Sequence, residues 1–376
     1  MRVLYSSYRP YIPQRVDGAL YAAHSLLALL VRRGHAAEAV VPLDQRRGGR
    51  LNTYRAARAL TGRRLLALGD RWNGYRTYRM WDNLLPAVLH RRIARKRPDV
   101  VLTQLDGCEA IAAEAMRAGV PVIVWIHDNE FTYFRGQLPP SPLLLSISAT
   151  DFVSAGMRAG LGYESPVLYP PIDLARCRAQ RGAAADAVTL INPVREKGVE
   201  IVLRVAELLP HRRFQLVETW PLSPEARRAL EGAVARLPNV SLHPSSPEIT
   251  PIYARTKLLL APSQWVEAFC TVAFEANVNG IPVVASRIGG IPTTVGEGGI
   301  LLEPDAPAEA WAQAVESLMR DPAAYEARSH LALANAARPE FDPERIVDRF
   351  LGLAQSHVER ARAGGEAMAA PRLQGA

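Results

Sequence analysis

Short apolar runs alternate with helix-like stretches throughout the second half of the chain, and this alternation constrains the fold more than any other feature. The apolar runs lie at residues 187–191, 214–217, 240–242, 258–261, 283–285 and 300–302. Buried parallel strands have continuous apolar sequences, and parallel neighbours must be joined by a crossover, usually a helix. The second half therefore predicts an α/β unit with a parallel sheet between helices.

The first half shows the same alternation and predicts another α/β unit. Strands are expected at 2–5, 36–41, 98–102, 120–126 and 143–149, with helices at 17–33, 108–118 and 154–161. A length of 376 residues also favours two domains over one. We therefore expect two Rossmann-like domains that face each other across a cleft. The predicted segments are a first domain at 1–170, a linker at 171–186, a second domain at 187–342, a helix at 343–362 and a disordered tail at 363–376.

Cysteine usage and hydropathy favour a cytoplasmic protein. Cys108, Cys177 and Cys270 are widely spaced and lack metal-ligand spacing, which is typical of a reducing compartment. The longest apolar segment, 19–31, contains His24 and is shorter than a bilayer span. We expect a soluble chain, or one peripheral to the inner face of the membrane. The formal charge of +8 suits acidic ligands or an anionic surface.

Residues 44–97 combine positive charge with interleaved aromatic side chains. The segment holds fifteen arginine or lysine residues against three aspartates. Its aromatic residues are Tyr54, Trp72, Tyr75, Tyr78 and Trp81. Such a segment could bind an acidic acceptor or touch an anionic membrane surface, and a solvated helical hairpin is the alternative. A nucleic acid partner is not expected, because no binding motif for one is present.

Glu267 and Glu275 flank the start of a helix predicted over 271–277. Carboxylates at this spacing share one face of a helix if the helix runs through both. The order strand, loop, helix places residues 269–271 at the helix N-terminus. Free backbone N–H groups there suit a phosphate at the carboxyl edge of the sheet. An ordinary strand-loop-helix unit with solvated glutamates is the alternative.

The loop at 192–198 brings cations to the end of another predicted strand. Lysine is rare in this chain, since Lys96, Lys197 and Lys257 are the three lysines among 45 basic residues. At Lys197 a compact ammonium can meet a phosphate as a point charge, and Arg195 lies in the same loop. The alternative is a solvated loop lysine.

Two features of the first half bear on function. His127 follows the apolar run at 120–126, and the carboxyl ends of parallel strands are where ligands bind in open α/β folds. We therefore favour a functional role for this histidine over a packing role. The long loop at 6–16 lacks Gly-x-Gly-x-x-Gly, which disfavours a nicotinamide-dependent dehydrogenase.

Taken in order, the motifs of the second half resemble a known family. Arg-Glu-Lys-Gly at 195–198 follows a strand, and Glu-x7-Glu spans 267–275. Later motifs are Gly-Ile-Pro-Val-Val-Ala-Ser at 280–286, Gly-Gly-Ile-Pro at 289–292 and Gly-Gly-Ile-Leu-Leu-Glu-Pro at 298–304. The combination resembles the donor half of the retaining GT-B glycosyltransferases of family 4. Paired glycines such as 289–290 let a backbone approach a ligand closely.

The resemblance implies a role for each candidate residue. Lys197, aided by Arg195, would neutralise the leaving diphosphate, and Glu267 would accept hydrogen bonds from sugar hydroxyls. Glu275 would hold the ribose, and His127 would line the donor sugar. Further donor contacts are implied for Gly18, Phe269, Cys270 and Thr271. The first domain would bind the acceptor, and the helix at 343–362 would cross back onto it.

The chain departs from the family pattern at three places. Ile191-Asn192 stands where the family usually has Gly-Arg, and Cys270 replaces a glycine. Gly18 alone matches a Gly-Gly pair of relatives. No Asp-x-Asp occurs, so no metal is implied, and no other cofactor is expected.

The predicted function is retaining, metal-independent transfer of a sugar from a UDP- or GDP-type donor to a hydroxyl or other nucleophile of the acceptor. The leaving phosphate would itself take the acceptor proton in a front-face mechanism. The acceptor could be a small molecule, a glycan or a lipid-linked glycan. A sugar-phosphate-processing GT-B enzyme such as a phosphorylase, or a non-catalytic nucleotide-sugar-binding protein, is the alternative. A phosphorylase would release sugar phosphate, whereas a binder would show no turnover.

Overall fold

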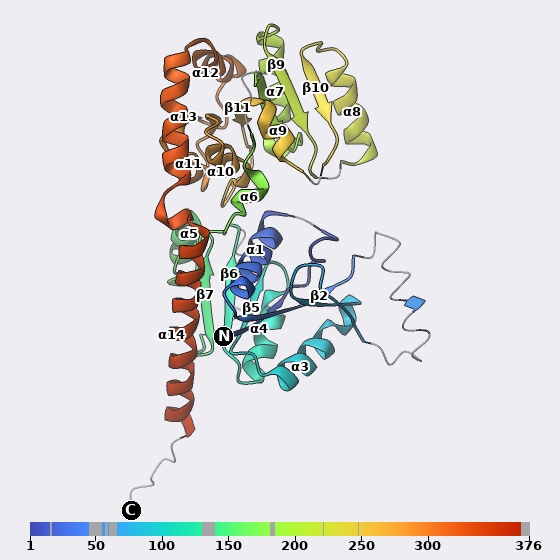
Figure 1. Cartoon of the computed structure of the whole chain (residues 1–376), viewed down its shortest axis with the longest axis vertical. Helices are drawn as coiled ribbons and strands as arrows, with labels where there is room; N and C mark the ends of the chain where they lie inside the picture. The colour runs from blue at the N-terminus through green and yellow to red at the C-terminus, as the bar shows by residue number, and fades with distance from the viewer. Residues whose placement is uncertain are drawn as a thin grey trace, which may run out of the picture. The chain divides into compact units, whose positions relative to one another are not determined.

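The computed structural model describes residues 1–15, 17–44, 55–56, 59, 66–129, 140–180, 185–220, 222–246 and 248–369 (Figure 1). They form two compact units, one from residues 1–172 together with the chain from Glu340 onward, the other from Asp173–Pro339. Parts of the predicted segments lie outside the described residues. They include most of 45–65 with Tyr54, residues 130–139 of the first domain, residues 181–184 of the linker and residues 370–376 of the tail.

The first unit is built on a seven-stranded sheet in the order β3-β4-β2-β1-β5-β6-β7. β3 runs antiparallel to β4, and every other neighbouring pair is parallel. The strands are β1 (Arg2–Ser6), β2 (Ala36–Pro42), β3 (Leu68–Asp70), β4 (Arg76–Met80), β5 (Val100–Gln104), β6 (Val122–Ile126) and β7 (Leu144–Ser148). The helices are α1 (Gly18–Arg32), α3 (Leu85–Lys96), α4 (Cys108–Arg117), α5 (Asp151–Leu161) and α14 (Pro343–Ala369).

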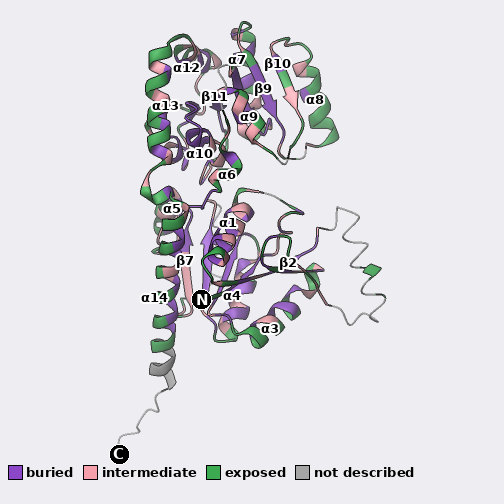
Figure 2. Cartoon of the chain, viewed as in Figure 1, coloured by how far each residue is buried: buried purple, intermediate pink, exposed green. Residues whose placement is uncertain are grey.

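Helix α1 forms where the sequence predicts it, because its start is capped and its length is apolar. The Asp17 carboxylate accepts a hydrogen bond from the Leu20 backbone N–H at 3.0 Å, which satisfies one of the free donors of the first turn. Leu26 and Leu27 are fully buried. β5 and β6 are buried along their whole length (Figure 2), as the continuous apolar runs indicate.

Helix α14 packs along the first unit. Arg349 Nε donates to the Val167 carbonyl at 2.6 Å, and His357 Nε2 donates to the Leu143 carbonyl at 3.0 Å. The helix is assigned as far as Ala369, beyond the end at residue 362 that the sequence predicts.

The basic and aromatic segment is partly core, which corrects the helical hairpin considered for it. β3 and β4 occupy its middle, where threonine and tyrosine fit a pleated strand. Tyr75 is buried, and its hydroxyl lies 2.7 Å from the Tyr11 hydroxyl and 2.9 Å from His24 Nδ1. Side chains used in this way are not available to an acceptor or a membrane surface.

Arg79 on β4 fixes the long loop between β1 and α1. Its side chain is 2% exposed, and Nε donates to Asp70 Oδ2 at 2.7 Å. Nη1 donates to the Tyr11 carbonyl at 3.1 Å and Nη2 to the Ile12 carbonyl at 2.6 Å. A guanidinium can be buried here because a carboxylate and carbonyl oxygens satisfy its donors.

The second unit is a wholly parallel six-stranded sheet in the order β10-β9-β8-β11-β12-β13. The strands are β8 (Ala187–Ile191), β9 (Arg213–Val217), β10 (Val240–His243), β11 (Thr256–Ala261), β12 (Val283–Ser286) and β13 (Gly299–Leu302). The helices are α6 (Leu174–Cys177), α7 (Val199–Leu208), α8 (Pro224–Val234), α9 (Thr250–Arg255), α10 (Thr271–Val278), α11 (Ile291–Val295), α12 (Ala308–Arg320) and α13 (Pro322–Ala336). Trp311 of α12 is fully buried in a core shared with α7.

The predicted fold class is confirmed, since each unit has a Rossmann-like sheet between helices, wholly parallel in the second unit and parallel except for β3 in the first. All six strands predicted for the second unit are present. In the first unit, β3 and β4 are additions that the sequence reasoning missed.

We predict that Arg79→Met destabilises the protein by about 3 kcal/mol, because it leaves Asp70 and the loop carbonyls partly buried without their donor. Urea denaturation followed by circular dichroism measures the loss. The matched control is Arg76→Met on the same strand, where the arginine is exposed, and it should leave the transition midpoint near that of the wild type. Equal effects of the two substitutions would show that the buried network does not stabilise the loop.

Candidate functional site

The strand order of the second unit selects one place at the edge of its sheet. From β8 the chain moves outward through β9 and β10, whereas β11, β12 and β13 extend in the opposite direction. Ligands in open α/β sheets bind at such a reversal, outside the carboxyl ends of the two central strands. The candidate site therefore comprises the loop after β8 and the loop after β11.

These two loops are locked together through their backbones. The Gln264 N–H donates to the Glu196 carbonyl at 2.9 Å, and Ser263 Oγ donates to the same carbonyl at 3.3 Å. Gly198 has φ of 75°, and a Cβ at this position would lie 2.0 Å from the Pro262 carbonyl oxygen. Only glycine permits both this conformation and this approach.

Lys197 and Glu267 meet at this junction. Lys197 Nζ lies 2.9 Å from Glu267 Oε1, and the two side chains are 17% and 12% exposed. The sequence assigned the lysine to a phosphate and the glutamate to sugar hydroxyls, without predicting that they pair. Their contact holds a positive charge at the strand edge without leaving it uncompensated in a poorly hydrated place.

An aromatic ring completes the surroundings of Lys197. The centroid of the Trp220 ring lies 5.2 Å from Nζ, within the range of a cation–π contact. Trp220 follows β9, the neighbour of β8. Arg195, the other predicted cation, is exposed at the first residue of the short 3-10 helix Arg195–Lys197.

Asn192 stands at the position where the family usually has arginine, and it binds the loop after β9. It is buried with φ of 63°, a conformation that asparagine tolerates better than most residues. Its Oδ1 accepts hydrogen bonds from the Trp220 N–H at 2.9 Å and the Thr219 N–H at 3.2 Å, and also from the Thr219 hydroxyl. The loop after β8 is thereby tied to the loop after β9.

The N-terminus of α10 presents backbone N–H groups beside Glu267. Phe269 and Cys270 precede the helix, Thr271 is its first residue, and no side chain caps it. Uncapped first-turn amides and the helix dipole favour an anion. Cys270 is buried, and burial, reinforced by the neighbouring Glu267 carboxylate, raises the pKa of its thiol. The thiol is therefore neutral and adds no charge here.

Glu275 lies on α10, whereas Glu267 lies in the preceding loop. The helix begins at Thr271, so the two carboxylates do not share a helix face. Glu275 is partly buried, and Oε2 accepts a hydrogen bond from the Tyr253 hydroxyl at 2.6 Å. Burial raises the pKa of the Glu275 carboxyl group, although the tyrosine hydrogen bond opposes the shift. The alternative of a solvated glutamate is excluded.

The paired glycines approach protein backbone. A Cβ on Gly289 would lie 2.3 Å from the Glu267 carbonyl oxygen, and one on Gly290 would lie 1.8 Å from that of Ala268. The Gly290 N–H also donates to the Glu267 carbonyl at 2.7 Å. These glycines therefore set the position of Glu267, a role that the sequence analysis did not assign to them.

Gly18 and His127 belong to the first unit. Gly18 is the exposed first residue of α1. His127 follows β6, and its ring centroid lies 4.5 Å from that of Trp125. His127 Nε2 is buried and has no hydrogen-bond partner among the described residues. Burial lowers the pKa of His127 to about 3, so the ring is neutral at physiological pH.

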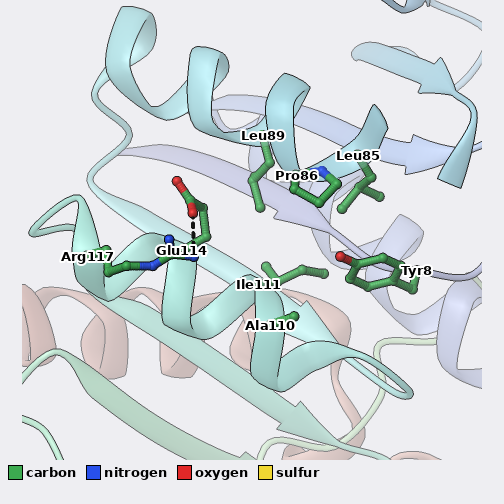
Figure 3. Close-up of a pocket in the computed structure, with 8 residues that line it drawn as sticks. All are labelled: Tyr8, Leu85, Pro86, Leu89, Ala110, Ile111, Glu114 and Arg117. Atoms are coloured by element: carbon green, nitrogen blue, oxygen red, sulfur yellow. Dashed lines mark ion pairs between the residues drawn. The ribbon is translucent and has the colours of Figure 1, made fainter. Parts of the chain in front are cut away.

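A cavity of about 120 Å³ lies elsewhere in the first unit, between α3 and α4 (Figure 3). Tyr8, Leu85, Leu89 and Ile111 supply much of its apolar wall. It contains none of the predicted site residues. Its volume is below the 300 Å³ or so of a typical small-molecule pocket, so it is too small for a nucleotide sugar.

Among the described residues, no group of three or more His, Cys, Asp and Glu side chains is arranged to hold a metal ion. Among the same residues, no helix combines the length and apolar character needed to cross a bilayer.

The site residues that sequence reasoning missed are Asn192, Trp220 and Tyr253. An Asn-Pro step after a strand indicates a special backbone conformation, which could have drawn attention to Asn192. Trp220 could have been found as an aromatic residue directly after a predicted strand. Tyr253 carries no local signal, because its contact with Glu275 depends on how α9 and α10 pack.

Known proteins share sequence with this chain. The family model for Glycosyl transferases group 1 matches residues 187–321. A D-inositol 3-phosphate glycosyltransferase of Segniliparus rotundus is 32% identical over 289 residues, which cover 66% of this chain and 63% of the relative. D-inositol 3-phosphate glycosyltransferase 1 of Catenulispora acidiphila is 31% identical over 214 residues, 52% of this chain and 50% of the relative. The chain thus matches less than two thirds of either relative's length.

Solved structures share the fold over nearly the whole chain. HepE of Anabaena in complex with UDP-glucose has a TM-score of 0.73 at 17% identity, covering 95% of this chain and 100% of its own. Sucrose-phosphate synthase of Thermosynechococcus elongatus has a TM-score of 0.72 at 16% identity, covering 95% and 99%. Residues 187–321 therefore match the glycosyl transferases group 1 family, and the two Rossmann-like units have the fold of GT-B glycosyltransferases.

Proposed function

We propose that the protein is a retaining glycosyltransferase of family 4 that uses a nucleoside diphosphate sugar. The observation that carries the proposal is the Lys197 ammonium at the strand-order reversal, paired with Glu267 beside the uncapped amides of α10. A cation and oriented N–H groups are what a departing diphosphate needs. The family match over 187–321 contains all of these groups.

Lys197 is the group proposed to bind the diphosphate. As the bond to the sugar breaks, negative charge grows on the phosphate oxygens, and the ammonium stabilises it. A bound diphosphate competes with Glu267 for Nζ, since both are anions. The carboxylate that is released in this way can then accept hydrogen bonds from the sugar hydroxyls.

The other end of the donor is proposed to bind along α10. The amides near Phe269, Cys270 and Thr271 face a phosphate, and Glu275 accepts the ribose hydroxyls. The Tyr253 hydroxyl, 2.6 Å from Glu275 Oε2, fixes the carboxylate and leaves Oε1 for the ribose. Arg195, Gly18 and the neutral His127 keep the donor contacts predicted from the family resemblance.

Fixed cations and amides can stabilise the leaving group without a metal, so we propose metal-independent turnover. The donor is of the UDP or GDP type, and the complex of HepE with UDP-glucose supports the UDP form. The relatives named for D-inositol 3-phosphate favour a polyhydroxylated acceptor. The first unit is proposed to bind that acceptor.

The proposal is tested first by thermal shift with UDP, GDP, ADP and CDP, without added metal. A ligand that binds the native protein stabilises it in proportion to the logarithm of its concentration over Kd. We expect UDP or GDP to raise the melting temperature, and we expect sugar transfer from the corresponding nucleotide sugar in the presence of EDTA. A nucleotide that binds without transfer to any acceptor would favour the non-catalytic alternative, and release of sugar phosphate would favour the phosphorylase.

Replacement of the key ammonium tests the assignment directly. Lys197→Met should lower kcat/KM for the donor by about two orders of magnitude, equivalent to about 3 kcal/mol of transition-state stabilisation. The matched control is Lys257→Met, at the opposite end of β11, which should leave kcat/KM close to the wild-type value. Unchanged kinetics in folded Lys197→Met would remove the lysine from the mechanism.

The stereochemistry of the product tests the front-face mechanism. A leaving phosphate oxygen that takes the acceptor proton delivers the acceptor to the face that the phosphate leaves, so an α-linked donor should give an α-glycoside. The one-bond carbon–proton coupling at the anomeric centre, measured by NMR, reports the configuration. A β product would instead require a general base, and Asp17 at the start of α1 would be examined next.

A further inference from the structure

Trp220 is an exposed aromatic residue with a fixed position beside the candidate site. Trp220 is 42% exposed. Tryptophan side chains that contribute to stability are usually more buried than this. The ring nevertheless contacts Lys197, with 5.2 Å between its centroid and Nζ. Its exposure is therefore not that of an unattached surface side chain.

The backbone of Trp220 is hydrogen-bonded to Asn192, which lies in the loop after β8 that also carries Lys197. Asn192 Oδ1 accepts from the Trp220 N–H at 2.9 Å and from Thr219, while the Asn192 side chain is buried. Asn192 directly follows β8, in the loop that also carries Lys197. One buried amide therefore ties the backbone of Trp220 to the lysine loop.

We propose that Trp220 is a positioning residue that holds the Lys197 ammonium for the donor diphosphate. The inference rests on the proposed function and adds to it a residue outside the family motifs described above. Lysine is a flexible side chain, and its four-carbon stem can place Nζ in many positions. Nζ contacts both the Glu267 carboxylate and the indole face, and together these contacts restrict Nζ to the strand edge.

The indole would hold the Lys197 ammonium in place once a diphosphate binds. The incoming anion weakens the pairing of Lys197 with Glu267, because both compete for the same ammonium. A cation–π contact carries no net negative charge, so it persists beside the phosphate without repelling it. Trp220 therefore keeps the ammonium in place at the stage when the carboxylate turns to the sugar.

Binding of the nucleoside diphosphate that stabilises the wild type, UDP or GDP, tests the proposal by calorimetry on the full chain. Trp220→Leu should weaken Kd at least about tenfold, whereas Trp220→Phe retains an aromatic face and should weaken it by less than about threefold. The matched control is Trp72→Leu, which replaces an indole 57% exposed in the first unit and should leave Kd unchanged. A loss with Trp72→Leu equal to that with Trp220→Leu, or no rescue by phenylalanine, would overturn the role.

Asn192→Gly provides a second variant that leaves the indole present. Glycine accepts the positive φ at this position but removes the oxygen that binds Trp220. Kd should weaken in the same direction as in Trp220→Leu. An unchanged Kd in folded Asn192→Gly would contradict the part assigned to the asparagine.

Fluorescence separates this inference from the proposed function. The emission of Trp220, taken as the difference between wild type and Trp220→Phe, should change when the nucleotide binds, and the change should disappear in Lys197→Met. A nucleotide that raises the melting temperature without altering this emission would refute the role of Trp220 alone. Failure of both UDP and GDP to bind the wild type would refute the proposed function, and the role of Trp220 with it.

Discussion

The approach of Gly198 to the Pro262 carbonyl is the constraint on which the candidate site depends. It joins the loops after β8 and β11, the two central strands at the reversal of strand order. Without this contact, Lys197 and Glu267 would sit on loops that move independently, and a pair of long side chains would gain little from meeting. The contact between Gly198 and Pro262 places the two loops so that the side chains of Lys197 and Glu267 are within reach of each other. Gly289 and Gly290 also position Glu267, because side chains at these two positions would collide with the backbone of Glu267 and Ala268.

The Lys197 and Glu267 pair offers both a cation and a hydrogen-bond acceptor, as the proposed function requires. Two charges of opposite sign at 2.9 Å, both largely shielded from water, need each other in the absence of ligand. In the proposed function, a diphosphate would replace Glu267 as the partner of the ammonium, and hydroxyl donors of the sugar would then satisfy the carboxylate. Glu275 also has a partner within the protein, because the Tyr253 hydroxyl donates a hydrogen bond to one of its carboxylate oxygens.

Much of the fold followed from the sequence, because buried parallel strands leave continuous apolar runs. The strand ends in turn located Lys197, Glu267 and the start of α10. Contacts between distant segments did not follow. Nothing local predicts that Arg79, in a basic segment, is buried against the Tyr11 and Ile12 carbonyls, because the burial of a guanidinium depends on partners brought by the fold. For the same reason the sequence analysis assigned Gly290 to a ligand. A glycine pair indicates that the backbone approaches another group closely, but it does not show whether that group is a ligand or the protein's own backbone.

The position of α14 has a consequence for the order in which the chain can fold. The first unit is assembled from two segments, and the second unit, Asp173–Pro339, is inserted between them as one continuous stretch. During synthesis the ribosome therefore completes the inserted unit before α14 exists. Until then the surface around Val167 and Leu143, which α14 later covers, lacks its partner. Because domains tend to fold as units as they leave the ribosome, the unit that begins first is the one that finishes last.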